Sequence, residues 1–476
     1  MSSNAQNMAG YQPLHAPRGS SLSCKGWQQE AVLRTLINSL DPEVAERPND
    51  LVIGGAAGKA AADWDSLQTI IASLRQLGGD ESLAVESGKP AGIFRTKPHS
   101  PRVLVTSAAG APTGELVGNW LYAGTQTALP ELYEIYAAAA RTHFGGTLAG
   151  KLIVGGGMGG FGGAQPLAAA LHGAAFLGID ADAERIKRRV KSGYCEVMVN
   201  NLDEALRMLK NAVRQRKSAS IGLIGNCADL FPQLARRGVV PDLLTDCTPS
   251  EAPFSGYIPA GFDAASATDL RTDSDAVRQH AQESLAIQRA GALDLEHLGT
   301  RTITAASALD YLRPLADEGW GLTTWMALSG EPADVARIDR LALQLFPHDE
   351  RLQRWLPMAG RYVRFQGLPA RVTWLRENAL GAFGSAMNDL VARREISAPV
   401  LLGARFPVNN EDWGSSFPPG EGTTSDARLE TGACWFWLSG GGGPDNTRPF
   451  AMQAIVADGT AEAGERLSHW PMISPA

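Results

Sequence analysis

The sequence predicts an α/β protein, and two patterns lead to that prediction. Short apolar segments typical of strands alternate along the chain with segments whose apolar residues recur at helical spacing, as in a mainly parallel sheet. In addition, an apolar segment at residues 152–154 leads into the glycine run GGGMGGFGG at residues 155–163, which opens an alanine-rich helix. The order strand, glycine turn, helix is the pattern of a dinucleotide site.

Helices and strands are expected to alternate from the start of the chain. In the first quarter we expect a helix at residues 33–40, a short strand at 51–53 that enters Gly54 and Gly55, a helix at 64–77 and a strand at 102–106. In the middle we expect a strand at 221–224, a turn at 225–229, a helix to 237 and a strand at 241–246, followed by a helix at 275–299. Asp229 and Asp246 would lie at strand ends, where open α/β sheets bind ligands. Later we expect a helix at 329–345, long functional loops between 403 and 443, and strands at 433–438 and 452–457.

Composition limits the class of protein. A chain of 476 residues predicts roughly two to four domains. It is 44% apolar and 20% charged, and no apolar run approaches the roughly 18 residues of a membrane span, so a membrane partner is not expected. Residues 1–23 are polar, lack the pattern of a signal peptide and predict a flexible tail.

Cysteine usage and charge limit the compartment and the partners. The five cysteines are widely spaced without a C-x-x-C motif, which indicates reduced thiols in a cytoplasmic protein and no metal site. The net charge of −7 argues against nucleic acid as a partner. We interpret the basic runs at residues 185–191 and 210–217 as solvated helix faces.

The glycine run contains the spacing G-x-G-x-x-G twice, at residues 155, 157 and 160 and at residues 157, 159 and 162. Any glycine-rich bend can supply this spacing, so the run by itself leaves an ordinary loop as an alternative. Asp180 stands roughly 20 residues further on, at the end of the next expected strand, where an acid can hold ribose hydroxyls. No Arg follows Asp180 directly, which favours NAD over its phosphorylated relative, although Arg185 is near enough to weaken that preference.

Stretches along nearly the whole chain resemble the urocanate hydratase (urocanase) family. They are CKGWQQEAVLRTLINSLDPEVAERPNDLVIGG at residues 24–55, SGKPAGIFRT at 87–96, GGFGGAQPLA at 159–168, GLIGNCADLFPQLARRGVVPDLLTD at 222–246, GYIPAG at 256–261, FQGLPAR at 365–371 and IVADGT at 455–460. The resemblance implies a homodimeric lyase with tightly held NAD⁺. It also implies a Rossmann-type NAD domain at residues 125–317, inserted into a discontinuous core of residues 24–124 and 318–476.

The resemblance assigns the cofactor contacts to one set of residues. They are Gly54, Gly55, Gly160, Phe161, Gly162, Asp180, Arg185, Asn226, Cys227, Cys247, Thr248, Pro249, Ser250, Glu251, Tyr257, Ile258 and Gly442. Asp180 and the two glycine turns also follow from spacing, whereas the segments around Cys247 and Tyr257 rest on the resemblance alone. We interpret Cys227 and Cys247 as small packing groups at these turns and not as nucleophiles.

In the family, NAD⁺ takes no hydride. A ring carbon of the imidazole adds to the nicotinamide ring, which acts as an electrophile, so that water can enter and an imidazolone propionate forms. A site for this reaction must supply a proton donor and acceptor and an anchor for the substrate carboxylate.

The sequence departs from the family mainly on the substrate side. Trp413 stands where the family has a reactive-looking cysteine, Ser439 and Gly440 replace paired histidines, Thr324 replaces an arginine and Leu298 replaces a tyrosine. These replacements remove polar groups and add an apolar wall. We therefore expect a sulfur-substituted urocanate, such as S-methyl thiourocanate or thiourocanate, as the substrate, with plain urocanate as the alternative.

Candidate residues for the chemistry lie near these departures. The candidate catalytic groups are Glu411, Asp412 and Asp426, and the candidate substrate-binding residues are Trp413, Arg428, Tyr122, Gln126 and Thr324. Arg428 is the expected carboxylate anchor, because a cation must replace the arginine absent at Thr324. Two other classes stay open: an NAD-dependent oxidoreductase, which would produce absorbance at roughly 340 nm during turnover, and a non-catalytic NAD-binding protein.

Overall fold

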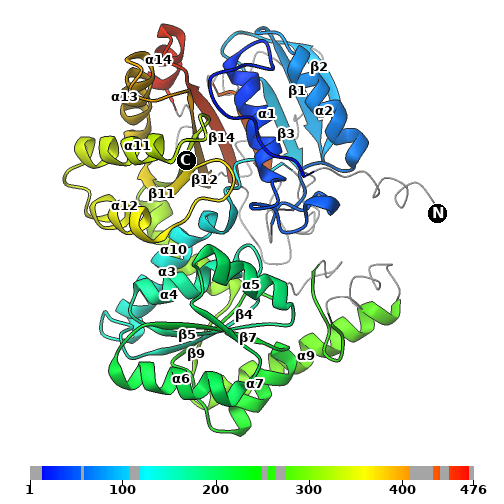
Figure 1. Ribbon diagram of the computed structural model, residues 1–476, viewed down its shortest axis with the longest axis vertical. Coiled ribbons are helices and arrows are strands. Elements are labelled where there is room, and N and C mark those ends of the chain that lie inside the picture. The colour runs from blue at the N-terminus through cyan, green and yellow to red at the C-terminus, as the bar shows by residue number, and fades with distance from the viewer. Residues whose placement is uncertain are drawn as a thin grey trace. The chain divides into compact units, whose positions relative to one another are not determined.

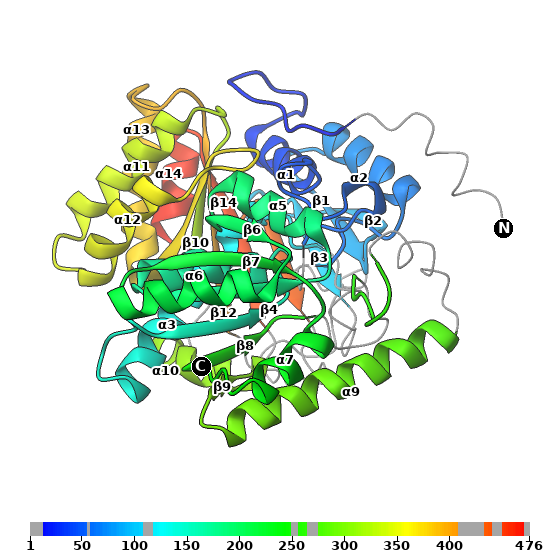
Figure 2. The same ribbon diagram turned by 60° about the horizontal axis from the view of Figure 1, so that its bottom comes forward.

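The computed structural model describes residues 13–54, 58–107, 118–248, 256–263, 275–407, 433–439 and 450–470 (Figures 1 and 2). The chain divides into two compact units. The core unit contains residues 1–124, 315–361 and 365–476, and the inserted unit contains residues 125–314 and 362–364. Among the described residues, no helix is both long and apolar enough to cross a bilayer.

An eight-stranded sheet forms the centre of the core unit. In spatial order its strands are β11 (Ala370–Arg376), β10 (Trp320–Ala327), β12 (Val400–Pro407), β14 (Phe450–Ala457), β13 (Trp435–Ser439), β3 (Val103–Ser107), β1 (Glu81–Glu86) and β2 (Lys89–Arg95). Figure 1 shows the blue strands of the N-terminal part and the orange to red strands of the C-terminal part in this one sheet. The two parts join where β3 pairs with β13.

The expectation of a mainly parallel sheet is wrong for the core unit. Strand β3 runs parallel to β1 and β13, but the other neighbouring pairs are antiparallel. Two helices, α11 (Pro332–Leu345) and α12 (Glu350–Tyr362), follow β10 and return the chain to the end where it left that strand. The next strand, β11, must then run back antiparallel to β10. Alternation along the sequence does not reveal this, because it does not show how many helices separate two neighbouring strands.

Helices pack on both faces of the core sheet. Leu33 and Leu36 of α1 (Trp27–Ser39) belong to one apolar cluster with Met326 of β10, and α2 (Trp64–Gln76) contributes to the same cluster. Trp325, which points to the opposite face, donates to Asp339 of α11 and contacts Phe383 of α13 (Leu380–Ala392). The last helix of the core unit is α14 (Ala461–Ser468).

Some elements of the core unit match the sequence and others do not. The helix expected at 64–77 and the strands expected at 102–106 and 452–457 are confirmed. The strand expected at 51–53 is wrong, because Leu51 adopts a left-handed conformation (φ 60°) and Val52 makes isolated bridges. The β1–β2 hairpin was not predicted, since its turn at Ser87 and Gly88 was not separated from the surrounding polar sequence.

The segment before α1 packs on the core unit. Arg34, which is fully buried in α1, donates from Nη1 to the carbonyl oxygens of Gly19 and Leu328, both at 2.7 Å, and from Nη2 to Ser21. Its Nε donates to Glu30, whose carboxylate also accepts from Ser23. Burial would raise the pKa of Glu30, but these hydrogen bonds outweigh it and lower that pKa. Residues 19–23 are therefore held against the core and do not belong to a flexible tail.

A six-stranded parallel sheet forms the centre of the inserted unit. Its order is β6 (Val197–Val199), β7 (Ala219–Ile224), β5 (Ala175–Asp180), β4 (Leu152–Gly156), β8 (Leu243–Asp246) and β9 (Arg301–Ile303). The helices are α3 (Leu129–His143), α4 (Gln165–Leu171), α5 (Ala183–Ser192), α6 (Leu202–Gln215), α7 (Cys227–Arg236), α9 (Asp275–His297) and α10 (Ala305–Asp317), of which residues 315–317 are assigned to the core unit. They cover both faces of the sheet (Figure 1). The strands expected at 152–154, 221–224 and 241–246 are confirmed, but Asp229 lies in the first turn of α7 and not at a strand end.

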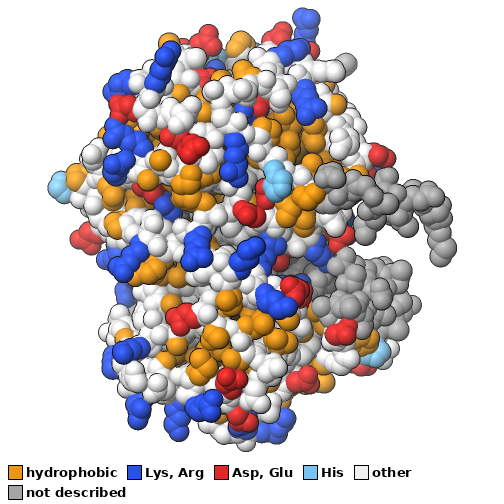
Figure 3. All heavy atoms as spheres, in the orientation of Figure 1, with side chains coloured by type: hydrophobic (Ala, Val, Ile, Leu, Met, Phe, Trp, Pro, Cys, Tyr) orange, Lys and Arg blue, Asp and Glu red, His pale blue; other side chains and the backbone are white. Residues whose placement is uncertain are grey.

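On the face of the molecule in Figure 3, basic and acidic side chains are both scattered among apolar ones.

Replacing Arg34 with Met should lower the free energy of unfolding by about 3–5 kcal/mol, because it leaves the buried Glu30 carboxylate without its cation. Urea denaturation measures this loss. Arg75→Met, at an exposed position of α2, is the matched control and should change stability by less than about 0.5 kcal/mol. Equal stability of the two variants would contradict the role we assign to Arg34.

Candidate functional site

The turn after β4 has the geometry of a dinucleotide fingerprint. Gly157 adopts a left-handed conformation (φ 78°) that glycine favours, and a Cβ on Gly162 would lie 2.1 Å from the Gly157 carbonyl oxygen. A Cβ on Gly159 would meet nothing within 4 Å, so the backbone there is open to a ligand. A tight turn, an open approach and a close contact are the three roles of the fingerprint glycines. Of the two overlapping spacings, residues 157, 159 and 162 therefore form the fingerprint.

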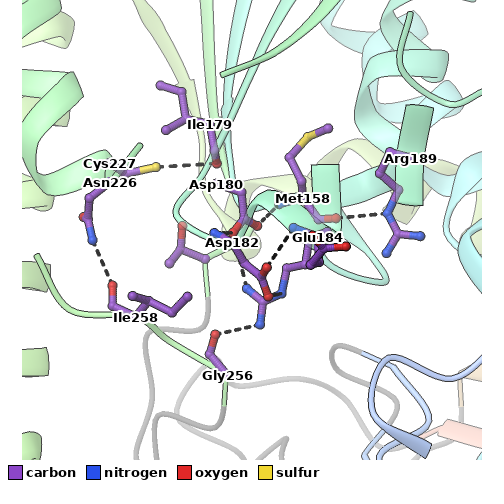
Figure 4. A network of polar contacts seen from close by, with 12 residues as sticks. Met158, Ile179, Asp180, Asp182, Glu184, Arg189, Asn226, Cys227, Gly256 and Ile258 are labelled. Atoms are coloured by element: carbon purple, nitrogen blue, oxygen red, sulfur yellow. Dashed lines mark hydrogen bonds and ion pairs between the residues drawn. The ribbon is translucent and has the colours of Figure 1, made fainter. Parts of the chain in front are cut away.

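Asp180 ends β5 beside this turn, and it is 5% exposed. Its Oδ2 accepts from the Met158 amide at 2.7 Å, and its Oδ1 accepts from the Asp182 amide at 2.8 Å, as Figure 4 shows. A carboxylate has about four acceptor positions, so these two bonds leave capacity for ribose hydroxyls.

Arg185 and Asn226 both bind the backbone of residues 256–258, of which Figure 4 labels Gly256 and Ile258. Arg185 Nη2 donates to the Gly256 carbonyl and Asn226 Nδ2 donates to the Ile258 carbonyl, both at 2.8 Å. Asn226 also caps α7 by accepting from the Ala228 amide. Arg185 lies 3.6 Å from Asp180 and 3.8 Å from Asp182, so its charge faces these two acids.

Strands β4 and β8 flank the point where the strand order reverses. After β4 the chain forms β5, β6 and β7 on one side of it, and then returns to place β8 on the other side of β4. There the Cys247 amide donates to the Gly156 carbonyl at 2.9 Å. A Cβ on Gly156 would lie 2.7 Å from Asp246 Oδ1 and 3.1 Å from Thr248 Oγ1. Ligands of open α/β sheets bind at such a switch point.

The two cysteines at this edge are protonated thiols at neutral pH. Burial raises the pKa of Cys247 to about 12, with a further contribution from Asp246. Burial also raises the pKa of Cys227 well above its ordinary value, although Cys227 begins a helix. A thiol without thiolate character is a poor nucleophile, which fits our interpretation of both as packing groups.

Arg189 was missed in the sequence, where it belongs to a basic run that we interpreted as solvated. It is 1% exposed, and its guanidinium donates to the Met158 carbonyl at 3.0 Å and to Thr125 Oγ1 at 2.6 Å. A Cβ on Gly163 would lie 2.1 Å from Arg189 Nε. The sequence feature that could have indicated this burial is Gly163, directly after Gly162, because a glycine leaves space for a buried side chain.

Three expected site residues lie in the core unit. The Tyr122 hydroxyl packs against Gly54, where a Cβ would lie 2.6 Å away. Thr324 is 7% exposed at the centre of β10 and pairs with Gly403 of β12. Leu121 packs on Gly403, because a Cβ there would lie 2.5 Å from Leu121 Cδ1. Thr324 and the residue before Tyr122 therefore share one face of the core sheet.

The remaining expected contacts divide between described and undescribed parts of the chain. Gln126 is 2% exposed, in the inserted unit, and its Nε2 has no hydrogen-bond partner among the described residues. Gly160, Phe161, Tyr257 and Ile258 lie on the two segments described above. Gly55, Pro249, Ser250, Glu251, Glu411, Asp412, Trp413, Asp426, Arg428 and Gly442 lie outside the described residues. Within the described part, no group of three or more His, Cys, Asp or Glu side chains could hold a metal ion.

The parallel sheet, the glycine turn and the switch point define the inserted unit as a Rossmann-type domain. Three family models match the chain in succession: the urocanase N-terminal domain at residues 14–153, the urocanase Rossmann-like domain at 124–310 and the urocanase C-terminal domain at 314–424. The protein therefore belongs to the urocanase family. Members of this family are hydro-lyases, so the protein is a carbon–oxygen lyase with a function of the urocanate hydratase type.

Gly162→Ala should lower the free energy of unfolding by about 1–3 kcal/mol, because the new methyl group collides with the Gly157 carbonyl. Gly159→Ala should leave it within about 0.5 kcal/mol of the wild type, because nothing occupies that space. Urea denaturation of both variants checks this contrast. A loss of similar size in Gly159→Ala would show that residues 157, 159 and 162 do not divide the three roles as stated.

Proposed function

We propose that the protein is an NAD⁺-dependent hydratase that adds water to a urocanate-type imidazole acrylate and forms an imidazolone propionate. The observation that supports this most directly is the glycine turn beside Asp180 in a chain of the urocanase family. The favoured substrate is a sulfur-substituted urocanate such as S-methyl thiourocanate, and plain urocanate is the second candidate.

The residues of the inserted unit fit NAD⁺. Gly159 offers open backbone for the pyrophosphate, and Asp180 offers acceptors for the ribose hydroxyls. Arg185 faces Asp180 and Asp182 and donates to Gly256, which favours NAD⁺ over its phosphorylated relative because this guanidinium already faces two acids. When bound, NAD⁺ would supply an electron-poor ring that makes the imidazole acrylate susceptible to water.

The chain's own residues must orient the substrate and move protons. Glu411, Asp412 and Asp426 are our candidate proton donors and acceptors, because water addition needs a general acid and a general base. Tyr122 and Gln126 are proposed to bind the substrate by hydrogen bonds. The Tyr122 hydroxyl can both donate and accept, and Gln126 Nε2 is a buried donor for which a bound ligand would supply an acceptor.

The core sheet supports a substrate with a less polar ring substituent. The face that holds Thr324 also holds Met326 and Ala454, and both belong to the apolar cluster. Arg405 lies on this same face, two residues beyond Gly403. Among the described positions of this face on β10, β12 and β14, it is the one residue that carries a charge. We propose Arg405 as a second candidate anchor for the substrate carboxylate, in addition to Arg428. Trp413 belongs to the same proposed substrate site.

The proposed function is tested by incubating the purified protein with urocanate, thiourocanate and S-methyl thiourocanate and following the loss of each conjugated chromophore. We expect loss with a sulfur-substituted substrate and no new absorbance at roughly 340 nm, because no net hydride transfer occurs. Loss with plain urocanate alone would select the second candidate. New absorbance near 340 nm would indicate an oxidoreductase, and an unchanged spectrum with all three would contradict the proposed substrate class.

Gly159→Ala should weaken NAD⁺ binding about tenfold or more, because its methyl group would occupy the space that the pyrophosphate approaches. Calorimetric titration of the full-length chain measures the affinity. Gly79→Ala in the core unit is the matched control, since a Cβ there also meets nothing within 4 Å, and it should bind NAD⁺ like the wild type. Unchanged binding in Gly159→Ala would exclude this glycine from the pyrophosphate site.

That the protein acts on its small-molecule substrate as a cytoplasmic homodimer stays a prediction.

A further inference from the structure

One polar side chain lies on the buried face of α9. Ala281 and Leu285 pack in the protein interior with Tyr257, and Leu295 joins the apolar cluster of the parallel sheet. Gln288 lies between these positions at helical spacing and is 2% exposed. A glutamine at a position where an apolar residue would pack is the feature that needs an explanation.

Hydrogen bonding fixes the orientation of the Gln288 amide. Its Nε2 donates to Asp246 Oδ2, and Asp246 Oδ1 accepts from the Thr248 amide at 2.9 Å. A carboxylate accepts hydrogen bonds, so the nitrogen of the Gln288 amide must face it and the oxygen must face away. Gln288 Oε1 is buried, and among the described residues it has no hydrogen-bond partner. A buried acceptor without a donor is unfavourable, which points to a ligand that supplies the donor.

The strand order indicates which part of a dinucleotide lies there. Asp180 ends β5, on one side of β4, and Asp246 ends β8, on the other side. A dinucleotide crosses such a sheet at the switch point, with one mononucleotide half on each side. If Asp180 holds the ribose of the adenosine half, the nicotinamide half lies over β8, next to Asp246 and Gln288. Asp246 is itself exposed to solvent, so the end of β8 is accessible.

We propose that Gln288 Oε1 accepts a hydrogen bond from the carboxamide NH₂ of the nicotinamide ring, and that Asp246 is the positioning residue that keeps the Gln288 amide in the accepting orientation. The proposal rests on the proposed function, because it requires a nicotinamide cofactor. Gln288 would then recognise the amide substituent of the ring, and with it the rotation of the ring about its glycosidic bond. Neither the glycine fingerprint nor Asp180 can supply that recognition, because both act on the phosphate and ribose groups.

The test compares NAD⁺ with 3-acetylpyridine adenine dinucleotide, in which a methyl ketone replaces the carboxamide and removes the donor. Both are titrated calorimetrically into the full-length wild type, Gln288→Met and Gln282→Met, after bound nucleotide has been removed and its absence confirmed by ultraviolet absorbance. The wild type should bind NAD⁺ about tenfold more tightly than the analogue, the effect of one unpaired buried acceptor. In Gln288→Met the two affinities should agree within about threefold. Gln282 is exposed on the same helix, so Gln282→Met should keep the tenfold preference.

Asp246→Asn provides a second variant should Gln288→Met fail to fold. An asparagine can donate to Gln288 Oε1 and so occupy the acceptor, which should also reduce the preference for NAD⁺ to less than about threefold. A full preference retained in Gln288→Met or Asp246→Asn, or no preference in the wild type, would overturn the role of Gln288 while NAD⁺ binding stands. Failure of the wild type to bind either nucleotide would instead overturn the NAD⁺ dependence in the proposed function, and this inference with it.

Discussion

The hydrogen bond from the Met158 amide to Asp180 is the interaction on which the candidate cofactor site depends. It joins the turn after β4 to the end of β5, and it requires the left-handed conformation of Gly157 in the preceding residue. The Met158 carbonyl is held in turn by the buried guanidinium of Arg189. The backbone amide and the backbone carbonyl of Met158 are therefore both fixed by charged side chains. Gly159, whose backbone is open, follows directly after this fixed residue.

A second constraint organises the core unit. Its sheet is complete only when β3, from the first quarter of the chain, pairs with β13 from the last part. The inserted unit falls between them in the sequence, so the core can form only after two segments more than 300 residues apart have met. Arg34 strengthens the same connection, since it binds carbonyls of both Gly19 and Leu328. Pairings this distant in sequence predict slow folding of the core.

Local sequence predicted the elements of the inserted unit well, because each strand of its sheet leads through a helix to another strand that runs parallel to it, and this alternation is visible in the sequence. It predicted the core sheet poorly. Strand direction in that sheet depends on whether one or two helices intervene, and the pairing partners are distant in the chain. The Val52 region also shows the limit of short apolar runs, since of the three apolar residues at 51–53 only Val52 makes isolated bridges and no strand forms.

The sequence by itself determined the α/β class, the family resemblance and the glycine and acid positions, because turn conformation and spacing are properties of the local chain. Only the tertiary structure decided which of two overlapping glycine spacings is used, because that depends on the contact between residues 157 and 162. It also decided that Arg189 is buried and that Gln288 faces Asp246. An exposed and a buried charge look alike in sequence, and only the packing of distant segments separates them.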